Sequence, residues 1–150
     1  MELPLEQRFG MVTSALFENV GSIAKAVDSK FGAAGRDVLR QVMNEKGVAL
    51  GQMLKPMSPG EDFKSVGTFF AQAVKMFGVE NEVEVKENEV IVKVPKCPYC
   101  LEGTNRELCE AMMAFDAGAV KTLGPNATLK IVKTIALGDP QCELSIAPKK

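Results

Sequence analysis

Apolar residues in the first half of the chain recur at the three- and four-residue spacing of amphipathic helices. The first stripe predicts a long helix that ends at a break between Gly32 and Gly35. A second stripe, from Leu39 to Leu54, predicts another helix, which Gly47 and Gly51 weaken because glycine has a low helix propensity. The residues of the first stripe are Leu5, Phe9, Val12, Leu16, Val20, Ile23 and Val27.

Two further helices have recognisable start signals. The segment 58–61 has a serine that can cap, a proline suited to the first turn and a glutamate that can close a capping box. Apolar residues at helical spacing run from Phe63 to Phe77, and Gly78 predicts the end of this helix. A second capping box at 104–107 opens a helix that ends before Gly124.

Elsewhere the apolar period changes to two, which is typical of strands with one buried face. Residues 83–94 predict a hairpin, a long strand follows over 129–137, and a last strand covers 142–146. Two hairpins and four helices predict an α+β fold, with the N-terminal helices and one later helix packed on an antiparallel sheet. The chain has no linker or repeat, so residues 1–150 are expected to form a single domain.

Charge and composition exclude several classes of protein. Eighteen basic and 19 acidic residues give a net charge of −1, so no basic surface for nucleic acid is expected. We also expect a cytoplasmic protein without a membrane span, because the N-terminus has no secretory signal and no window has roughly 20 apolar residues. Histidine is absent, which excludes Ser-His-Asp and Cys-His catalysis and any imidazole metal ligand.

The candidate chemistry lies in four cysteines. In a reducing compartment they favour metal binding or redox chemistry over structural disulfides. Cys97 and Cys100 form a C-x2-C pair, in which a tight turn can place both sulfurs on one ion, and Cys109 and Cys142 follow after eight and 32 residues. We predict that these four residues hold one structural zinc ion, because a site closed by four thiolates has no open coordination position.

Two other interpretations of the cysteines remain open. Cys-Pro-Tyr-Cys after a strand is also the active-site tetrapeptide of glutaredoxins, so Cys97 and Cys100 are candidates for a thiol redox sensor. The chain lacks the Thr-Val-Pro element of that family and too few residues follow for its fold, which leaves redox sensing on another fold. Cys109 and Cys142 also fit as small core residues, as free cysteine often is.

Residues 94–146 resemble a known family. A cysteine-bearing loop leads to the helix sequence Leu-Cys-Glu-Ala-Met-Met-Ala-Phe-Asp-Ala-Gly-Ala-Val, a strand follows, and then comes Gly-Asp-Pro-Gln-Cys-Glu-Leu at 138–144. This layout resembles the 4-vinyl reductase domain family of predicted hydrocarbon-binding proteins and its relatives, the L-2-amino-thiazoline-4-carboxylic acid hydrolases. The resemblance implies helices packed on an antiparallel sheet, binding of an apolar small molecule, and a homodimer.

Other candidate residues have simpler interpretations. Asp116 and Asp139 would polarise a water if the metal site were open. We expect Asp139, before a proline, to be a turn residue and Asp116 to lie on the solvated side of its helix. Eight methionines and eight phenylalanines are able to line an apolar pocket, although core packing is their usual role.

The sequence therefore predicts a non-enzymatic domain that binds an apolar small molecule between its helices and its sheet, with zinc as its cofactor. The alternatives are a redox sensor and, if the protein is an enzyme, a hydrolase that acts on a cyclic amidine, as the family resemblance implies.

Overall fold

The first helix of the computed structural model, which describes residues 2–150, bends sharply in its middle. Helix α1 spans Leu5–Leu54, and Gly32 interrupts it with φ 56° and ψ −133°. Residues with a Cβ atom rarely adopt this backbone conformation, so glycine at this position permits the bend. We call residues 5–31 the N-terminal arm and residues 33–54 the C-terminal arm. The predicted break is confirmed at Gly32, whereas Gly35 lies inside the C-terminal arm.

An ion pair bridges the bend. Arg36 donates to the carboxylate of Asp28, and the side-chain amide of Asn105 donates to the same carboxylate at 2.8 Å. The hydrogen bond from Asn105 and the charge of Arg36 hold the pKa of Asp28 below its usual value. The corner of α1 is thereby tied to the start of helix α3, which spans Arg106–Leu123.

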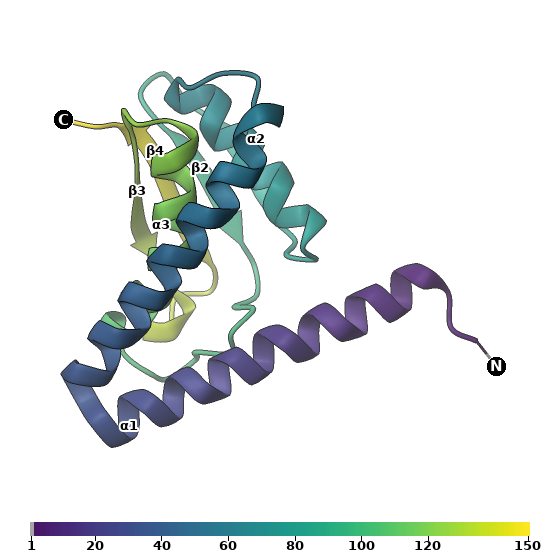
Figure 1. The fold of residues 1–150 in the computed structure, drawn as a ribbon, viewed down its shortest axis with the longest axis vertical. Helices are drawn as coiled ribbons and strands as arrows, with labels where there is room; N and C mark the ends of the chain where they lie inside the picture. The colour runs from purple at the N-terminus through teal and green to yellow at the C-terminus, as the bar shows by residue number, and fades with distance from the viewer. Residues whose placement is uncertain (1) are drawn as a thin grey trace.

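The C-terminal arm packs closely along α3 (Figure 1). Glycines make this approach possible, because a Cβ at Gly47 would overlap the backbone carbonyl of Phe115, and a Cβ at Gly51 would lie 2.6 Å from Cβ of Thr122. Gly118 on α3 lies in the same way against the carbonyl of Asn44. The glycines that weaken the predicted helix are therefore the residues that allow the two helices to meet.

Helix α2 spans Phe63–Met76 and begins later than the sequence signal suggests. The short 3-10 helix η1, Lys55–Met57, precedes it. Asp62 is the N-cap, since its carboxylate accepts from the backbone N–H groups of Lys64 and Ser65. The predicted capping role of Ser58 is wrong, because its hydroxyl donates to the carbonyl of Gly60 instead.

Four antiparallel strands form one sheet in the order β1-β2-β4-β3. The strands are β1 (Glu82–Val85), β2 (Val90–Val94), β3 (Ala127–Lys133) and β4 (Cys142–Pro148). The hairpin β1–β2 joins the second pair through the contact of β2 with β4. This arrangement confirms the α+β fold with helices on an antiparallel sheet.

The predicted strand 129–137 is too long. Strand β3 ends at Lys133, after a register shift between Ile131 and Lys133, and residues Ile135–Leu137 form the 3-10 helix η2. Thr134 causes this change, since its hydroxyl accepts from the N–H of Ala136 and caps η2. A side-chain cap of this kind competes with strand pairing, and apolar spacing alone does not reveal it.

Helix α3 also starts one residue later than predicted. Asn105 is its N-cap and accepts from the N–H of Leu108 at 2.7 Å. The hydroxyl of Thr104 donates to the carbonyl of Leu101 and therefore belongs to the preceding loop.

The core has two parts. The larger part lies between α2, α3 and the sheet, and the smaller part lies around the cysteine loop at 97–101. Fully buried side chains of the larger part include Val66, Phe70, Val90, Val92, Val120, Leu123 and Ile146.

The apolar stripe of the N-terminal arm is mostly exposed. Six of its residues have exposed fractions between 39% and 74%. The arm reaches away from the rest of the molecule toward its N-terminal end (Figure 1). These six residues are Leu5, Phe9, Val12, Leu16, Val20 and Ile23.

The arm contacts the cysteine loop through Phe17, Gly21 and Lys25. A Cβ at Gly21 would overlap the carbonyl of Tyr99, and Lys25 donates to the carbonyl of Cys100 at 3.1 Å. Phe17 packs edge-to-face on Tyr99 with ring centroids 5.4 Å apart.

Within residues 2–150, no helix has both the length and the hydropathy needed to cross a bilayer.

Candidate functional site

An apolar cavity of about 500 Å³ lies where the N-terminal arm, the C-terminal arm, α2, α3 and the sheet meet. Its size is that of a small-molecule site. Each element contributes apolar side chains, which include Phe17, Val20, Met43, Leu50, Met53, Phe70, Phe77, Val92, Met112, Met113, Phe115 and Leu144. Methionine and phenylalanine therefore do more here than fill the core, and the cavity lies between helices and sheet as predicted.

Three of the four cysteines line this cavity: Cys97, Cys109 and Cys142. Each sulfur has a polar neighbour. The Cys109 thiol lies 3.2 Å from the Thr134 hydroxyl, Cys97 Sγ accepts from the N–H of Leu101, and Cys142 Sγ accepts from the N–H of Ile135.

Burial raises the pKa of the Cys97 and Cys109 thiols, and the neighbouring Cys142 raises both further. Neutral thiols are weak nucleophiles, because the thiolate is the reactive form. This environment disfavours the low-pKa thiolate that a redox sensor based on Cys97 needs.

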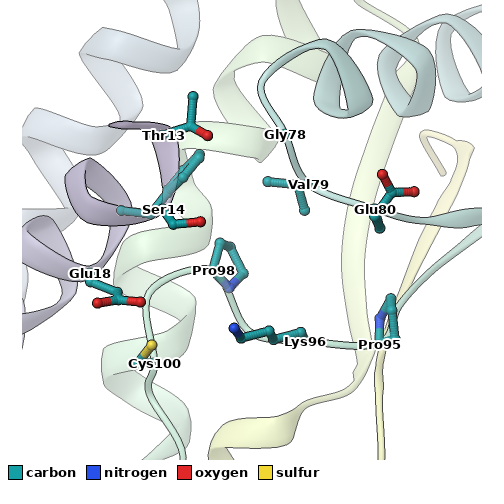
Figure 2. A pocket seen from close by; sticks show the side chains of 11 residues that line it. Thr13, Ser14, Glu18, Gly78, Val79, Glu80, Pro95, Lys96, Pro98 and Cys100 are labelled. Atoms are coloured by element: carbon teal, nitrogen blue, oxygen red, sulfur yellow. The ribbon is translucent and has the colours of Figure 1, made fainter. Parts of the chain in front are cut away.

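Cys100 lies apart from the other three. Its backbone has φ 53°, and its side chain lines a smaller pocket of about 130 Å³ beside the large cavity, together with Glu18, Glu80 and Lys96 (Figure 2). Among the residues that the structure describes, no group of three or more cysteine, aspartate or glutamate side chains is arranged to hold a metal ion. Zinc binding by the four cysteines therefore stays a prediction.

Asp116 is the one carboxylate that lines the large cavity. The expectation that it lies on the solvated side of α3 is wrong. Burial raises the pKa of Asp116 to about 7, because the charged form loses its hydration in the apolar cavity. The sequence contains a signal for this position, since Asp116 stands four residues after Met112 and three before Ala119, on the buried face of the helix.

Tyr99 and Lys46 are further polar groups on the cavity wall. Burial raises the pKa of the Tyr99 phenol well above its usual value, and the nearby carboxyl of Asp116 raises it further. Tyr99 therefore remains a neutral hydroxyl at physiological pH. Lys46 is exposed, so its ammonium group is hydrated at the edge of the cavity.

Asp139 has the structural role expected of it. Its carboxylate accepts from the backbone N–H of Thr134 at 2.9 Å and closes the turn between η2 and β4. It does not line the large cavity.

The model of the L-2-amino-thiazoline-4-carboxylic acid hydrolase family matches residues 10–146. This match agrees with one of the two families that the sequence resembles, whereas the assignment to the 4-vinyl reductase family is not confirmed. No curated protein matches the chain significantly.

Two solved structures are similar to this fold. Trafficking protein particle complex subunit 3 from Naegleria fowleri, covalently bound to palmitic acid, has a TM-score of 0.69 and 18% identity, covering 93% of this chain and 96% of its own. The phenol-responsive sensory domain of the transcription activator PoxR, with phenol, has a TM-score of 0.61 and 14% identity, covering 91% of this chain and 74% of its own. At these identities the likeness concerns the fold.

Proposed function

This chain belongs to the L-2-amino-thiazoline-4-carboxylic acid hydrolase family, and we propose that it binds or senses an apolar small molecule in the large cavity. The observation that carries this proposal is a cavity of about 500 Å³ with a wall whose surface is almost entirely apolar. Burial of an apolar ligand against such a wall is favourable by roughly 25 cal/mol for each Å² removed from water. The palmitic acid and phenol held by the two proteins of similar fold support the proposal.

A blocking variant tests this function. Val20 lines the cavity from the N-terminal arm and is 39% exposed. We therefore expect the Val20→Trp variant to fold, with the indole ring placed inside the cavity. We expect this variant to bind octanol at least about tenfold more weakly, measured by displacement of a fluorescent apolar dye, because the ring occupies ligand volume.

Ile23→Trp is the matched control. Ile23 lies on the same arm and the same apolar stripe and is 61% exposed, but it does not line the cavity, and tryptophan keeps the stripe apolar. It should bind octanol as the parent protein does. Equal octanol affinity in both variants, or no octanol binding by the parent protein, would contradict the cavity as the binding site.

A hydrolase that acts on a cyclic amidine is the second candidate. Asp116 favours it, since a carboxyl with a pKa of about 7 is suited to general acid-base catalysis near neutral pH. Turnover of L-2-amino-thiazoline-4-carboxylic acid that Asp116→Asn abolishes would support this candidate. The exposed Asp37→Asn serves as its control. Absence of turnover in the parent protein would count against it.

Zinc bound by Cys97, Cys100, Cys109 and Cys142 is a separate part of the proposal. Its support is that three of these residues line one cavity and the fourth belongs to the same C-x2-C loop. The proposal requires the Cys100 side chain to turn away from the small pocket. Elemental analysis should find one zinc per chain, and a metal-free protein with four reactive thiols would contradict the proposal.

We also propose that the chain forms a homodimer through the exposed stripe of the N-terminal arm. Exposed apolar patches of this kind mark interaction surfaces.

A further inference from the structure

The cavity wall contains one acidic group among its apolar side chains. Besides Asp116, the titratable residues on the wall are Lys46 from the C-terminal arm, Tyr99 from the cysteine loop, and the three thiols of Cys97, Cys109 and Cys142. The phenol of Tyr99 and the thiols of Cys97 and Cys109 have raised pKa values and stay neutral. Lys46 is the one basic residue on the wall, and it lies exposed at the edge.

Asp116 has no partner in the described part of the chain. Its carboxylate takes part in none of the side-chain hydrogen bonds or ion pairs between residues 2 and 150, whereas Asp28, Asp37, Asp62 and Asp139 all do. Burial alone raises its pKa, so no neighbouring positive charge compensates it. Asp116 is partly buried, and its carboxylate opens into the cavity. An ionised carboxylate that faces an apolar wall without a partner is costly, and a ligand that supplies the partner would remove this cost.

We propose that Asp116 selects an apolar ligand that has a single positively charged nitrogen, such as a primary alkylamine. This inference rests on the proposed binding function and specifies its ligand class. The apolar tail occupies the cavity, and the ammonium group brings both a counter-charge and N–H donors to the carboxylate. Hydrogen bonds between ionised partners are roughly twice as strong as those between neutral groups.

The same residue disfavours other ligands. A fatty acid would bring a second carboxylate into the cavity beside Asp116, and like charges at close range repel. An alcohol or an alkane makes the same apolar contacts with the wall but leaves the carboxylate of Asp116 without a counter-charge. Discrimination therefore depends on the head group, while the tail contributes similar burial in each ligand.

The test compares three ligands of equal chain length at pH 8, where Asp116 is largely ionised: octylamine, octanol and octanoate. Displacement of a fluorescent apolar dye from the full chain measures each affinity. We expect octylamine to bind at least about tenfold more tightly than octanol, and octanoate to bind most weakly. This ranking is measured on the parent protein and needs no variant.

Two variants then assign the effect to one residue. Asp116→Asn should lose the preference for octylamine and keep its affinity for octanol, and Asp116→Leu should do the same. Asp37→Asn removes the same charge from an exposed position and should keep the preference. Circular dichroism and octanol binding show that each variant is folded.

The outcomes separate this inference from the proposed function. Binding of octanol without any advantage for octylamine overturns the role of Asp116 and leaves the binding function intact. Loss of the preference in Asp37→Asn as well would mean that net charge, not Asp116, attracts the amine, and this also overturns the inference. Failure of all three ligands to bind contradicts the proposed function itself.

Discussion

At the scale of single residues, ionisation of Asp116 opposes folding. Its pKa is about 7 in the folded protein, against 3.8 for an ordinary aspartate. Between these two values the folded state holds a proton that the unfolded state has lost, so stability falls as pH rises from about 4 to 7 and levels off above that. Below pH 4 both states are protonated and the penalty vanishes.

Asp116→Asn should therefore be more stable than the parent protein at alkaline pH. We expect its advantage in unfolding free energy to grow by about 2 kcal/mol between pH 5 and pH 8, because the amide cannot ionise. Urea denaturation at the two pH values measures the difference. Asp37→Asn should show no such growth, since Asp37 is exposed. A pH-independent difference for Asp116→Asn would contradict the buried, uncompensated carboxylate.

The sequence contains a signal for part of this site, although the charge of Asp116 predicts a position in solvent. Helical spacing places Asp116 on the same face as Met112, and this spacing outweighs its charge as a guide to its position. The division of the cysteines has no such signal, because spacing along the chain brings Cys97 and Cys100 together but does not give the direction of each sulfur. That direction depends on the positive φ of Cys100 and on the contact of its carbonyl with Lys25, which lies 75 residues away.

At the scale of elements, the glycines of the C-terminal arm set the distance between α1 and α3. A Cβ at Gly47 would lie 2.9 Å from Cα of Phe115 and overlap its carbonyl, and backbone atoms cannot move aside as a flexible side chain does. Gly47→Ala should destabilise the protein by about 1–3 kcal/mol, despite the higher helix propensity of alanine. Urea denaturation of the variant measures this loss.

Gly10→Ala is the control for that substitution. Gly10 lies in the same helix, and a Cβ there would meet nothing within 4 Å. Alanine should stabilise this position by up to about 1 kcal/mol, because only helix propensity changes. If both variants changed stability in the same direction, the close approach of the two helices would not be the cause.

Apolar periodicity predicts most elements but fails where side chains bond to the backbone. The helices and the two hairpins follow from spacing, and the bend follows from Gly32. The N-caps at Asp62 and Asn105 and the cap at Thr134 each shift an element boundary from its predicted place. Several serines, threonines and acidic residues near each boundary are able to cap, and tertiary contacts select one of them.

At the scale of the whole molecule, the N-terminal arm joins the ligand cavity to the exposed stripe. Leu16 and Val20 belong to both, since they line the cavity and are 59% and 39% exposed. Periodicity alone predicts an amphipathic arm but not what covers it, because a stripe of this kind packs equally well on a core or on another chain. A second copy seated on the stripe would therefore lie against Leu16 and Val20 and cover that part of the cavity wall.

Phe9→Glu should weaken the proposed homodimer. Phe9 lies on the stripe, is 49% exposed and does not line the cavity, so a charge there opposes burial of the stripe without entering the ligand site. We expect the dissociation constant of the dimer, measured by analytical ultracentrifugation, to rise at least about tenfold.

Gln7→Glu is the control, since it adds the same charge at an exposed position outside the stripe. It should leave the dissociation constant of the dimer unchanged. Because a second copy would cover part of the cavity wall, the Phe9→Glu variant should also bind octanol more weakly than the parent protein. The two affinities should become equal when both proteins are diluted below the dimer dissociation constant of the parent. A parent protein that is monomeric at every concentration would contradict the dimer, whereas a dimer whose dissociation leaves octanol affinity unchanged would separate assembly from ligand binding.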